Sequence, residues 1–218
     1  MSYVDLTHEI YHHMPRIAIL PEVEVSCLFS IAEGKALNIS QLTMATHAGT
    51  HIDAPYHAFQ QGQTIDQLPL ETFVGPGAIV PVQARGGEPI TAANLENSGV
   101  RVERGDILLV QTGWDAHFTS SEYTMHPYLG EDACQWVIER GVKLIALDFL
   151  SPDLPLPLRP PDFAYPAHRG LLGHNIPIAE NLRNLGALQG ARCRILAFPL
   201  RVRGGDGGQA RFVAEPLG

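Results

Sequence analysis

The pattern of apolar and polar residues along the chain predicts a protein built mainly of strands. Polar and apolar side chains alternate at residues 22–27 and 37–44, which is typical of half-buried strands. Short, mostly apolar runs, typical of strands inside a sheet, occur at residues 4–7, 77–83, 107–111, 143–148, 192–198 and 209–214. The last run follows a glycine-rich turn at 204–208, so we expect it to complete a hairpin. Pro81 has no backbone N–H, so its strand should end there or lie at an edge of the sheet.

Helical patterns are fewer. Residues 132–140 form the clearest one, with Gly141 directly after it as a terminator. Thr91 is a suitable N-cap for a short helix that runs to Asn97. Two weaker patterns are also present. Residues 179–188 have a helical leucine spacing, with Gly190 beyond it, and residues 64–68 could form a single helical turn. Strands interspersed with a few helices, without an internal repeat or a linker, predict an α/β fold: one domain over residues 1–218, with a mixed β-sheet flanked by helices.

Composition narrows the range of partners and compartments. The 218 residues are 45% hydrophobic and 17% charged, with a mean hydropathy of zero, as in a soluble globular protein. A net charge of −8 argues against nucleic acid or an anionic membrane as the main partner. No apolar run approaches the roughly 18 residues of a membrane span, and the first residues do not resemble a signal peptide. Three cysteines far apart favour free thiols in a reducing compartment, so we expect a cytoplasmic protein.

The strongest candidate for a functional site lies in the middle of the first half of the chain. Three histidines and an aspartate fall within eleven residues: His47, His51, Asp53 and His57. A straight strand would separate His47 from His51 by about 13 Å, too far to share one ion, whereas residues four apart in a helix have Cβ atoms about 5–6 Å apart. Gly49 permits unusual backbone angles, and Pro55 rules out a continuous helix. We therefore expect a bent segment that turns the first three ligands toward a cation, with His57 reaching in from beyond it.

Other readings remain open from the residues alone. A lone histidine is usually a surface or core residue, although four potential ligands with this spacing are much less often incidental. Three ligands would leave coordination positions free, as in a catalytic ion site rather than a structural one. Further ligands could come from His168, His174 or Glu180, and spacing does not choose between the two histidines. Glu180 could instead only complement the dipole at the start of the helix predicted at 179–188.

The segment from His47 to His57 resembles the signature of the cyclase-type metal-dependent hydrolases, a family that includes bacterial kynurenine formamidases and isatin hydrolases. Other segments are also similar to the family and follow its order, at residues 5–8, 64–68, 111–114, 148–153 and 205–208. The resemblance therefore covers nearly the whole chain. It implies a fold of the swivelling β/β/α type and a homo-oligomer, a dimer or a tetramer.

The resemblance also implies roles for individual residues. His47, His51 and Asp53 would bind the metal, and His57 would be the catalytic acid/base. A later histidine, followed by a leucine pair and by a glutamate twelve residues on, completes the family's site and corresponds to His168 and Glu180, which leaves His174 outside the pattern. Imidazole and carboxylate ligands suit Zn²⁺ and also Mn²⁺, either as one ion or as two ions bridged by Asp53.

The reaction that these roles imply is hydrolysis of a C–N amide bond in a small molecule, such as an aryl formamide, a cyclic amide or a lactam. A bound ion would polarise the carbonyl and activate a water, and His57 would accept the water proton and return it to the leaving nitrogen. The alternatives are a lyase or ring-closing reaction at the same site, and a metal- or small-molecule-binding protein without catalysis. A structural ion has little need of a fourth histidine so close by.

Two departures from the family pattern concern the substrate. Ala58 follows His57 where family members commonly have an aromatic residue, and residues 17–21 replace the Trp-Pro-Gly-Asp-like segment of kynurenine formamidases. This mostly apolar run between two prolines should either cover the core or form a wall of the substrate pocket. The candidate substrate residues are Ile17, Leu20, Tyr56, Phe59, Trp114 and Phe163.

Overall fold

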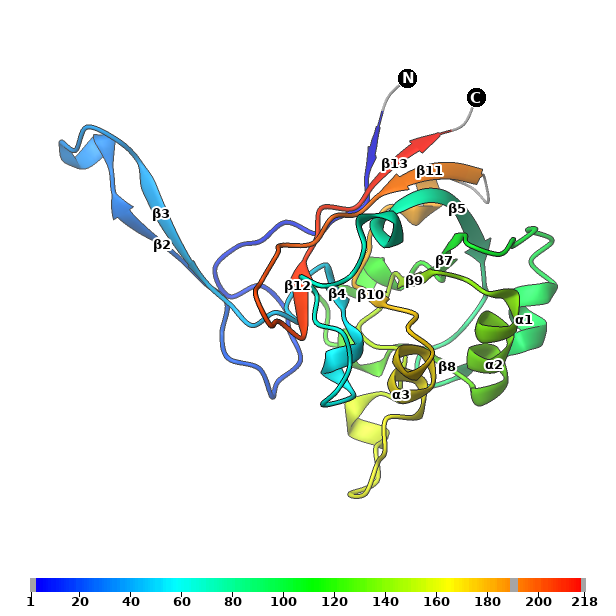
Figure 1. Ribbon diagram of the computed structural model, residues 1–218. Helices are drawn as coiled ribbons and strands as arrows, with labels where there is room; N and C mark the ends of the chain where they lie inside the picture. Colours follow the sequence, from blue (N-terminus) through cyan, green and yellow to red (C-terminus); the bar gives the residue numbers. More distant parts are fainter. Residues whose placement is uncertain (1–2, 189–191, 217–218) are drawn as a thin grey trace.

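A nine-stranded mixed β-sheet forms the centre of the protein in this computed structural model (Figure 1). The structure describes residues 3–188 and 192–216. The strands lie in the order β1-β13-β11-β5-β7-β9-β10-β4-β12. Their bounds are β1 (Val4–Asp5), β4 (His51–Asp53), β5 (Val74–Pro81), β7 (Ile107–Gln111), β9 (Leu144–Leu147), β10 (Ile178–Glu180), β11 (Arg192–Leu196), β12 (Gly207–Gln209) and β13 (Val213–Pro216). The predicted α/β class with a mixed sheet is confirmed.

Four parallel strands, β5, β7, β9 and β10, make up the middle of the sheet. Strands β7 and β9 are buried on both faces, because side chains that alternate along a strand enter two separate cores. Leu108 and Val110 enter one core, and Ile107 and Leu109 enter the other. Strand β5 pairs with β7 on one side and β11 on the other, so Pro81 marks the end of a strand and not an edge of the sheet.

Helices α1 (Ala92–Glu96), α2 (Glu131–Arg140) and α3 (Pro166–Gly173) pack on one face of the sheet (Figure 1). The first two confirm the predictions, since Thr91 caps α1 and Gly141 ends α2 in the left-handed conformation. Loops and short 3₁₀ helices cover the other face. The 3₁₀ helices are η1 (Ile31–Glu33), η2 (Pro55–His57), η3 (Leu70–Phe73), η4 (Trp114–His117), η5 (Tyr123–Met125), η6 (Leu156–Leu158) and η7 (Leu185–Leu188). None of the described helices combines the length and the apolar character needed to cross a bilayer.

The helix predicted at 179–188 is wrong. Its first residues belong to β10, which hydrogen-bonds to β9 and β4, and only η7 is helical. Asn181 and Asn184 have φ angles of 56° and 59°, in the left-handed region that interrupts a right-handed helix. Gly190 lies outside the described residues. Residues 64–68 likewise form a turn, in which the N–H of Gln67 donates to the carbonyl of Thr64, and not a helical turn.

The expected C-terminal hairpin is confirmed. Strand β11 pairs antiparallel with β13, and the same register continues to the bridge between Pro199 and Ala210, on either side of the glycine-rich turn. Strand β12 in addition pairs with β4. Residues 210–212 are all that separates β12, at one end of the strand order, from β13, near the other end. The sheet therefore curls back on itself, and Gly207 and Gly208 belong to a strand beside the candidate site.

Strands β2 (Glu24–Phe29) and β3 (Ile39–Thr43) form an antiparallel hairpin that projects away from the body of the protein (Figure 1). We call this hairpin the arm. Its strands confirm the sequence prediction, but they are largely exposed and not half-buried. Val25 pairs with Leu42 on one face of the arm. Beyond an irregularity in the register Phe29 pairs with Ile39, which lies three residues from Leu42 and therefore on the opposite face. A further small sheet pairs β6 (Pro89–Ile90) with β8 (Tyr128–Leu129).

Candidate metal centre

The segment that contains the first four candidate residues bends, as expected. Gly49 has a φ of 69°, a left-handed conformation that favours glycine, and a Cβ there would also displace the end of the Met14 side chain, whose Cε atom would lie 2.9 Å away. Strand β4 follows at once and places His51 and Asp53 on the same face, with Ile52 pointing into the core. The chain then turns through η2, which presents His57.

The other two candidate ligands come from distant elements. Glu180 is the last residue of β10 and pairs directly with His51 of β4, which brings its carboxylate within 3.4 Å of His51 Nε2. Glu180 therefore ends a strand and does not open a helix. His168 lies in the first turn of α3, and its Nε2 is 3.4 Å from the Glu180 carboxylate. Strand pairing and one helix thus complete a cluster that begins in a single short segment.

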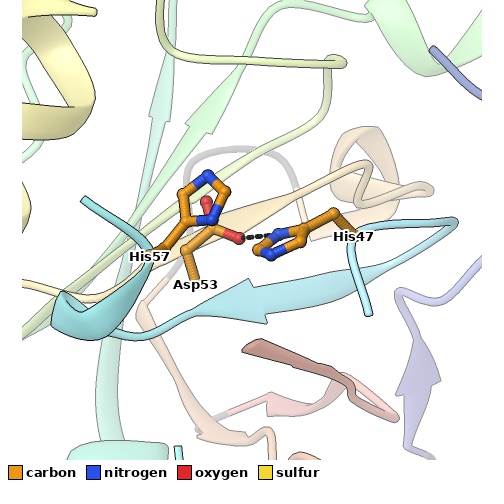
Figure 2. Close-up of side chains that lie close together, drawn as sticks. All are labelled: His47, Asp53 and His57. Carbon is orange, nitrogen blue, oxygen red and sulfur yellow. Dashed lines mark hydrogen bonds and ion pairs between the residues drawn. The ribbon is translucent and has the colours of Figure 1, made fainter. Parts of the chain in front are cut away.

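Asp53 is at the centre of this cluster. Its carboxylate is 2.7 Å from Nδ1 of His47 (Figure 2). It is also 3.2 Å from Nε2 of His51 and 3.5 Å from Nε2 of His168. The side chain of Asp53 is completely buried. A buried carboxylate surrounded by three imidazoles requires positive charge close to it.

The donor atoms of the cluster fit a divalent cation. His51 Nε2, Asp53 Oδ2 and Glu180 Oε1 are buried without a hydrogen-bond partner among the described residues. Two groups have ligand atoms within 4.8 Å of one another: one combines Asp53 with His47 and His57, and the other combines Asp53 with His51 and Glu180. Buried polar atoms that converge without hydrogen bonds are expected where a metal satisfies them, and these nitrogen and oxygen donors suit Zn²⁺ or Mn²⁺.

The electrostatics of the cluster point the same way. Burial alone would lower the pKa of His47, but the carboxylates of Asp53 and Asp206 outweigh it and raise this pKa to about 10. The pKa of His168 is also raised well above its usual value, against the effect of burial, by the nearby carboxylates of Asp153, Asp53 and Glu180. Burial, followed by the charge of Asp53, raises the pKa of Glu180. The carboxylates thus draw positive charge to the cluster, which is what a bound divalent ion supplies.

Two aspartates that the sequence analysis did not assign support the histidines. Asp153 accepts hydrogen bonds from the backbone N–H groups of Ala167 and His168, and it lies 2.5 Å from Nδ1 of His168. Asp206 lies 3.1 Å from Nε2 of His47, and it accepts a hydrogen bond from the hydroxyl of Thr46. Both belong to segments that resemble the family, at 148–153 and 205–208. The sequence therefore marked these segments, but it did not show that their aspartates contact the histidines.

His57 lies at the open side of the cluster. Its ring centroid is 4.0 Å from that of His47 and 5.5 Å from that of His168, and its side chain is 33% exposed (Figure 2). Burial lowers its pKa to about 4. The Asp206 carboxylate is 3.9 Å from its Nδ1. His57 is therefore the histidine of the cluster that a molecule entering from outside would meet.

A cavity of about 370 Å³ opens onto the cluster and is large enough for a small ligand. Five cluster residues line it: His47, Asp53, His57, His168 and Glu180. Ile17 and Leu20 line it as well, so the proline-bracketed loop forms a wall of the cavity and does not only cover the core. The other residues of the lining are Ile19, Ala58, Leu150, Ser151, Arg159, Ala164, Tyr165 and Arg169.

Four predicted substrate residues lie outside this lining. Trp114 packs against the core and donates its indole N–H to the carbonyl of Tyr123. Phe59 packs against the same core beneath the guanidinium of Arg169, 4.7 Å away. Phe163 lies beside Arg159, described below.

Tyr56 is the fourth of these residues. Its hydroxyl accepts a hydrogen bond from the side chain of Gln60. His174, the alternative ligand, is exposed and its ring lies against the carbonyl of Gly170, outside the cavity lining.

Comparisons with known proteins identify the family of the chain. The Cyclase family model matches residues 4–154. Kynurenine formamidase of Bacillus cereus (strain ZK / E33L) is 33% identical over 190 residues, which cover 87% of this chain and 85% of that protein. Kynurenine formamidase of Bacillus anthracis is also 33% identical, over 197 residues, with 87% and 86% covered.

Solved structures of similar fold include isatin hydrolases. Isatin hydrolase A from Labrenzia aggregata superimposes with a TM-score of 0.88 at 23% identity, over 100% of this chain and 94% of the other, which shows the fold. Isatin hydrolase A from Ralstonia solanacearum gives a TM-score of 0.86 at 25% identity, over 99% and 92%. With a family model that matches more than half of its length and relatives at 33% identity, the chain belongs to the Cyclase family.

Proposed function

We propose that this protein, a metal-dependent amide hydrolase, hydrolyses the C–N bond of an aryl formamide, a cyclic amide or a lactam. In this proposal His57 carries the proton. The position of His57 is the observation that carries the proposal. It is the most exposed member of the cluster, with 33% of its side chain exposed against 15% for His47, and it faces a cavity of the size of a small ligand.

The residues that would hold the metal are His47, His51, Asp53, His168 and Glu180. Asp53 belongs to both groups of converging ligand atoms, which supports a pair of ions with Asp53 between them. The absence of thiolates from the donor set supports Zn²⁺ or Mn²⁺. When bound, such an ion supplies Lewis-acid polarisation of the substrate carbonyl and a water that is nucleophilic at neutral pH.

His57 moves the proton in this proposal. Asp206 lies near its Nδ1, which leaves Nε2 for the reacting molecules. Nε2 accepts a proton from the attacking water and returns it to the leaving nitrogen, so that the C–N bond breaks to give a carboxylate and an amine. The rings of His47 and His168 hold the imidazole in place on either side.

Metal analysis combined with a substrate screen tests the proposal. The protein is loaded with Zn²⁺ or Mn²⁺ and assayed with N-formyl aryl amides, isatin-like lactams and cyclic imides. We expect His57→Ala to retain its metal and to lose roughly 10²–10⁴-fold in kcat. His51→Ala should lose metal, and His174→Ala, which alters an exposed histidine outside the cavity, should behave as wild type.

Each variant has an outcome that contradicts the proposal. Wild-type turnover in His57→Ala would remove this residue from the mechanism. Metal loss in the same variant would make His57 a ligand. A wild-type protein that binds metal but hydrolyses no compound of the three classes would favour a binding protein over an enzyme.

A homo-oligomer is the second part of the proposal, and the arm supports it. A two-stranded hairpin is marginally stable alone in water, and this one exposes apolar side chains, with Phe29 48%, Ile39 40% and Leu42 49% exposed. A second copy of the chain would bury these side chains. We expect light scattering to give a dimer or tetramer for the wild type and a smaller mass for Phe29→Ser/Leu42→Ser.

The matched control for the arm is Ser26→Ala/Gln41→Ala, which changes a paired polar position of the same two strands and leaves the apolar side chains in place. It should keep the wild-type mass. A monomeric wild-type protein, or an unchanged mass for Phe29→Ser/Leu42→Ser, would contradict the assignment of the arm to self-association.

A cytoplasmic location is the third part. Cys27, Cys134 and Cys193 are all free thiols, as is usual in a reducing compartment. Fractionation of the native cells, with a cytoplasmic and an exported marker, tests this location directly.

A further inference from the structure

Two arginines line the cavity of this acidic protein, and neither has a carboxylate partner among the described residues. They are Arg159 and Arg169. The arginines that do form ion pairs in the described part of the chain are Arg16, Arg101, Arg140, Arg192, Arg194 and Arg211. In a chain with a net charge of −8, a cation left without a carboxylate at a cavity is available for an anion from outside.

Arg159 is held in a fixed position. Its Nε donates to the carbonyl of Leu154, 2.6 Å away. Its Cζ lies 4.9 Å from the ring centroid of Tyr165 and 5.2 Å from that of Phe163. The proline-rich loop that carries it restricts the backbone as well. With Nε occupied and the plane stacked, the two terminal nitrogens are the atoms that remain for a ligand, and no described residue accepts from them.

Arg169 is engaged differently. Its Nη1 donates to the carbonyl of Ala58, and its guanidinium covers the ring of Phe59. Arg169 is also exposed, whereas Arg159 is half-buried. A half-buried guanidinium is less screened by solvent, so it binds an anion more strongly. Arg159 is therefore the better anion site of the two.

The position of Arg159 relative to the metal cluster sets the shape of the ligand. Tyr165 lies between them: its ring centroid is 4.9 Å from Cζ of Arg159 and 6.2 Å from the ring of His168. Ile17, Leu20 and Leu150 supply apolar surface in the same cavity. A molecule that reaches from the cluster to Arg159 thus has an apolar middle about the size of one ring.

We infer that Arg159 recognises a carboxylate on the substrate, separated by an apolar or aromatic ring from the amide that is cleaved. The planar guanidinium offers two parallel N–H groups, which match the two oxygens of a carboxylate. This inference rests on the proposed amide hydrolysis and names the substrate class for the same cavity: ring-bearing amides with an anionic group at the far end.

A matched pair of substrates tests the inference. N-Formyl-4-aminobenzoate carries the carboxylate across the ring from the formamide, and N-formylaniline lacks it. We expect the metal-loaded wild type to favour the first by roughly 10-fold in kcat/KM, which corresponds to about 1.4 kcal/mol. Arg159→Met should lose this preference, Arg159→Lys should keep part of it, and Arg183→Met, an arginine outside this cavity, should keep all of it. A wild type without the preference, or an Arg159→Met variant that retains it, overturns the inference.

A binding measurement separates this inference from the proposed function. If the metal-loaded wild type hydrolyses neither formamide, the proposed function fails for this substrate type. Calorimetric titration of metal-free protein with 4-toluenesulfonate and with 4-toluenesulfonamide then decides about Arg159. Tighter binding of the sulfonate that disappears in Arg159→Met supports an anion site, and equal binding of the two compounds by the wild type overturns it.

Discussion

Asp153 offers the most specific test of how the metal cluster is held, through the substitution Asp153→Asn. Its carboxylate is 1% exposed, accepts from two backbone N–H groups and lies against Nδ1 of His168. The substitution replaces one carboxylate oxygen with an NH₂ group that can only donate. If the NH₂ faces His168, Nδ1 has to accept, and the ring proton moves to Nε2, the nitrogen that faces Asp53 and Glu180. If the amide takes the opposite orientation, the N–H of Ala167 loses its acceptor.

Both orientations have a calculable cost. A buried donor left without an acceptor costs about 1–3 kcal/mol. For a chain of this length, roughly 2–4 °C of Tm correspond to each kcal/mol, so the expected decrease is on the order of 2–12 °C. Loss of the group that orients a histidine ligand lowers metal affinity by roughly 10–100-fold. Thermal unfolding of metal-free protein measures the first effect, and competition for Zn²⁺ with a coloured chelator measures the second.

Asp106→Asn is the matched control. Asp106 is also 1% exposed and accepts from the N–H of Glu103 and from both terminal nitrogens of Arg192, but it is not part of the cluster. This control should lose stability and keep the wild-type metal affinity. If Asp153→Asn also kept the wild-type affinity while losing stability, Asp153 would be a structural residue only, and the argument about the His168 tautomer would be refuted.

Three further predictions concern stability and the cluster. Gly207→Ala places a Cβ 2.7 Å from the carbonyl oxygen of Ile52 and 3.0 Å from Cε1 of His47, so it should cost about 1–3 kcal/mol and weaken metal binding, as urea unfolding and metal titration would show. Gly170→Ala, with open space around the new Cβ in α3, should instead stabilise the protein by about 0.5–1 kcal/mol in the same unfolding assay. Burial lowers the pKa of His126 to about 4. Between pH 6.5 and 4 the unfolded chain therefore binds a proton at this residue that the folded protein does not bind. The free energy of unfolding should fall by up to about 3 kcal/mol over this range. Unfolding at several pH values should show a smaller pH dependence for His126→Asn than for wild type, and an identical dependence would contradict the assignment.

The local part of the site could be predicted from the sequence, because the bend between His47 and His57 depends on residues next to one another. Gly49 and Pro55 exclude one continuous helix or strand from His47 to His57, and the bends at these two residues bring the ligands together. Glu180 shows the limit of this reasoning. Its place in the cluster followed from a family resemblance, but its strand did not follow from local pattern, because the strand exists through pairing with β4 and β9.

The lining of the cavity was less predictable for a related reason. Phe59 and Trp114 are aromatic residues close in sequence to site segments, and sequence does not distinguish an aromatic side chain that packs on the core from one that faces a ligand. Arg159 was not predicted, because its proposed role depends on the lack of a carboxylate partner among the described residues. Only the folded chain shows which arginines have such a partner. The alternation in β2 and β3 correctly predicted strands, but these strands are largely exposed, and a local pattern does not reveal whether a strand packs on the body of its own chain.

The attachment of the arm has a mechanical consequence for the site. The chain leaves β3 and reaches the cluster within a few residues, yet two anchors lie between them: the carbonyl of Ala45 accepts from the side chain of Gln209, and the hydroxyl of Thr46 donates to Asp206. These bonds tie the root of the arm to the body of the protein ahead of His47. A displacement of the arm would therefore be stopped at these two bonds before it reached the first ligand. Substitutions in the arm should accordingly leave the metal affinity of the protein unchanged.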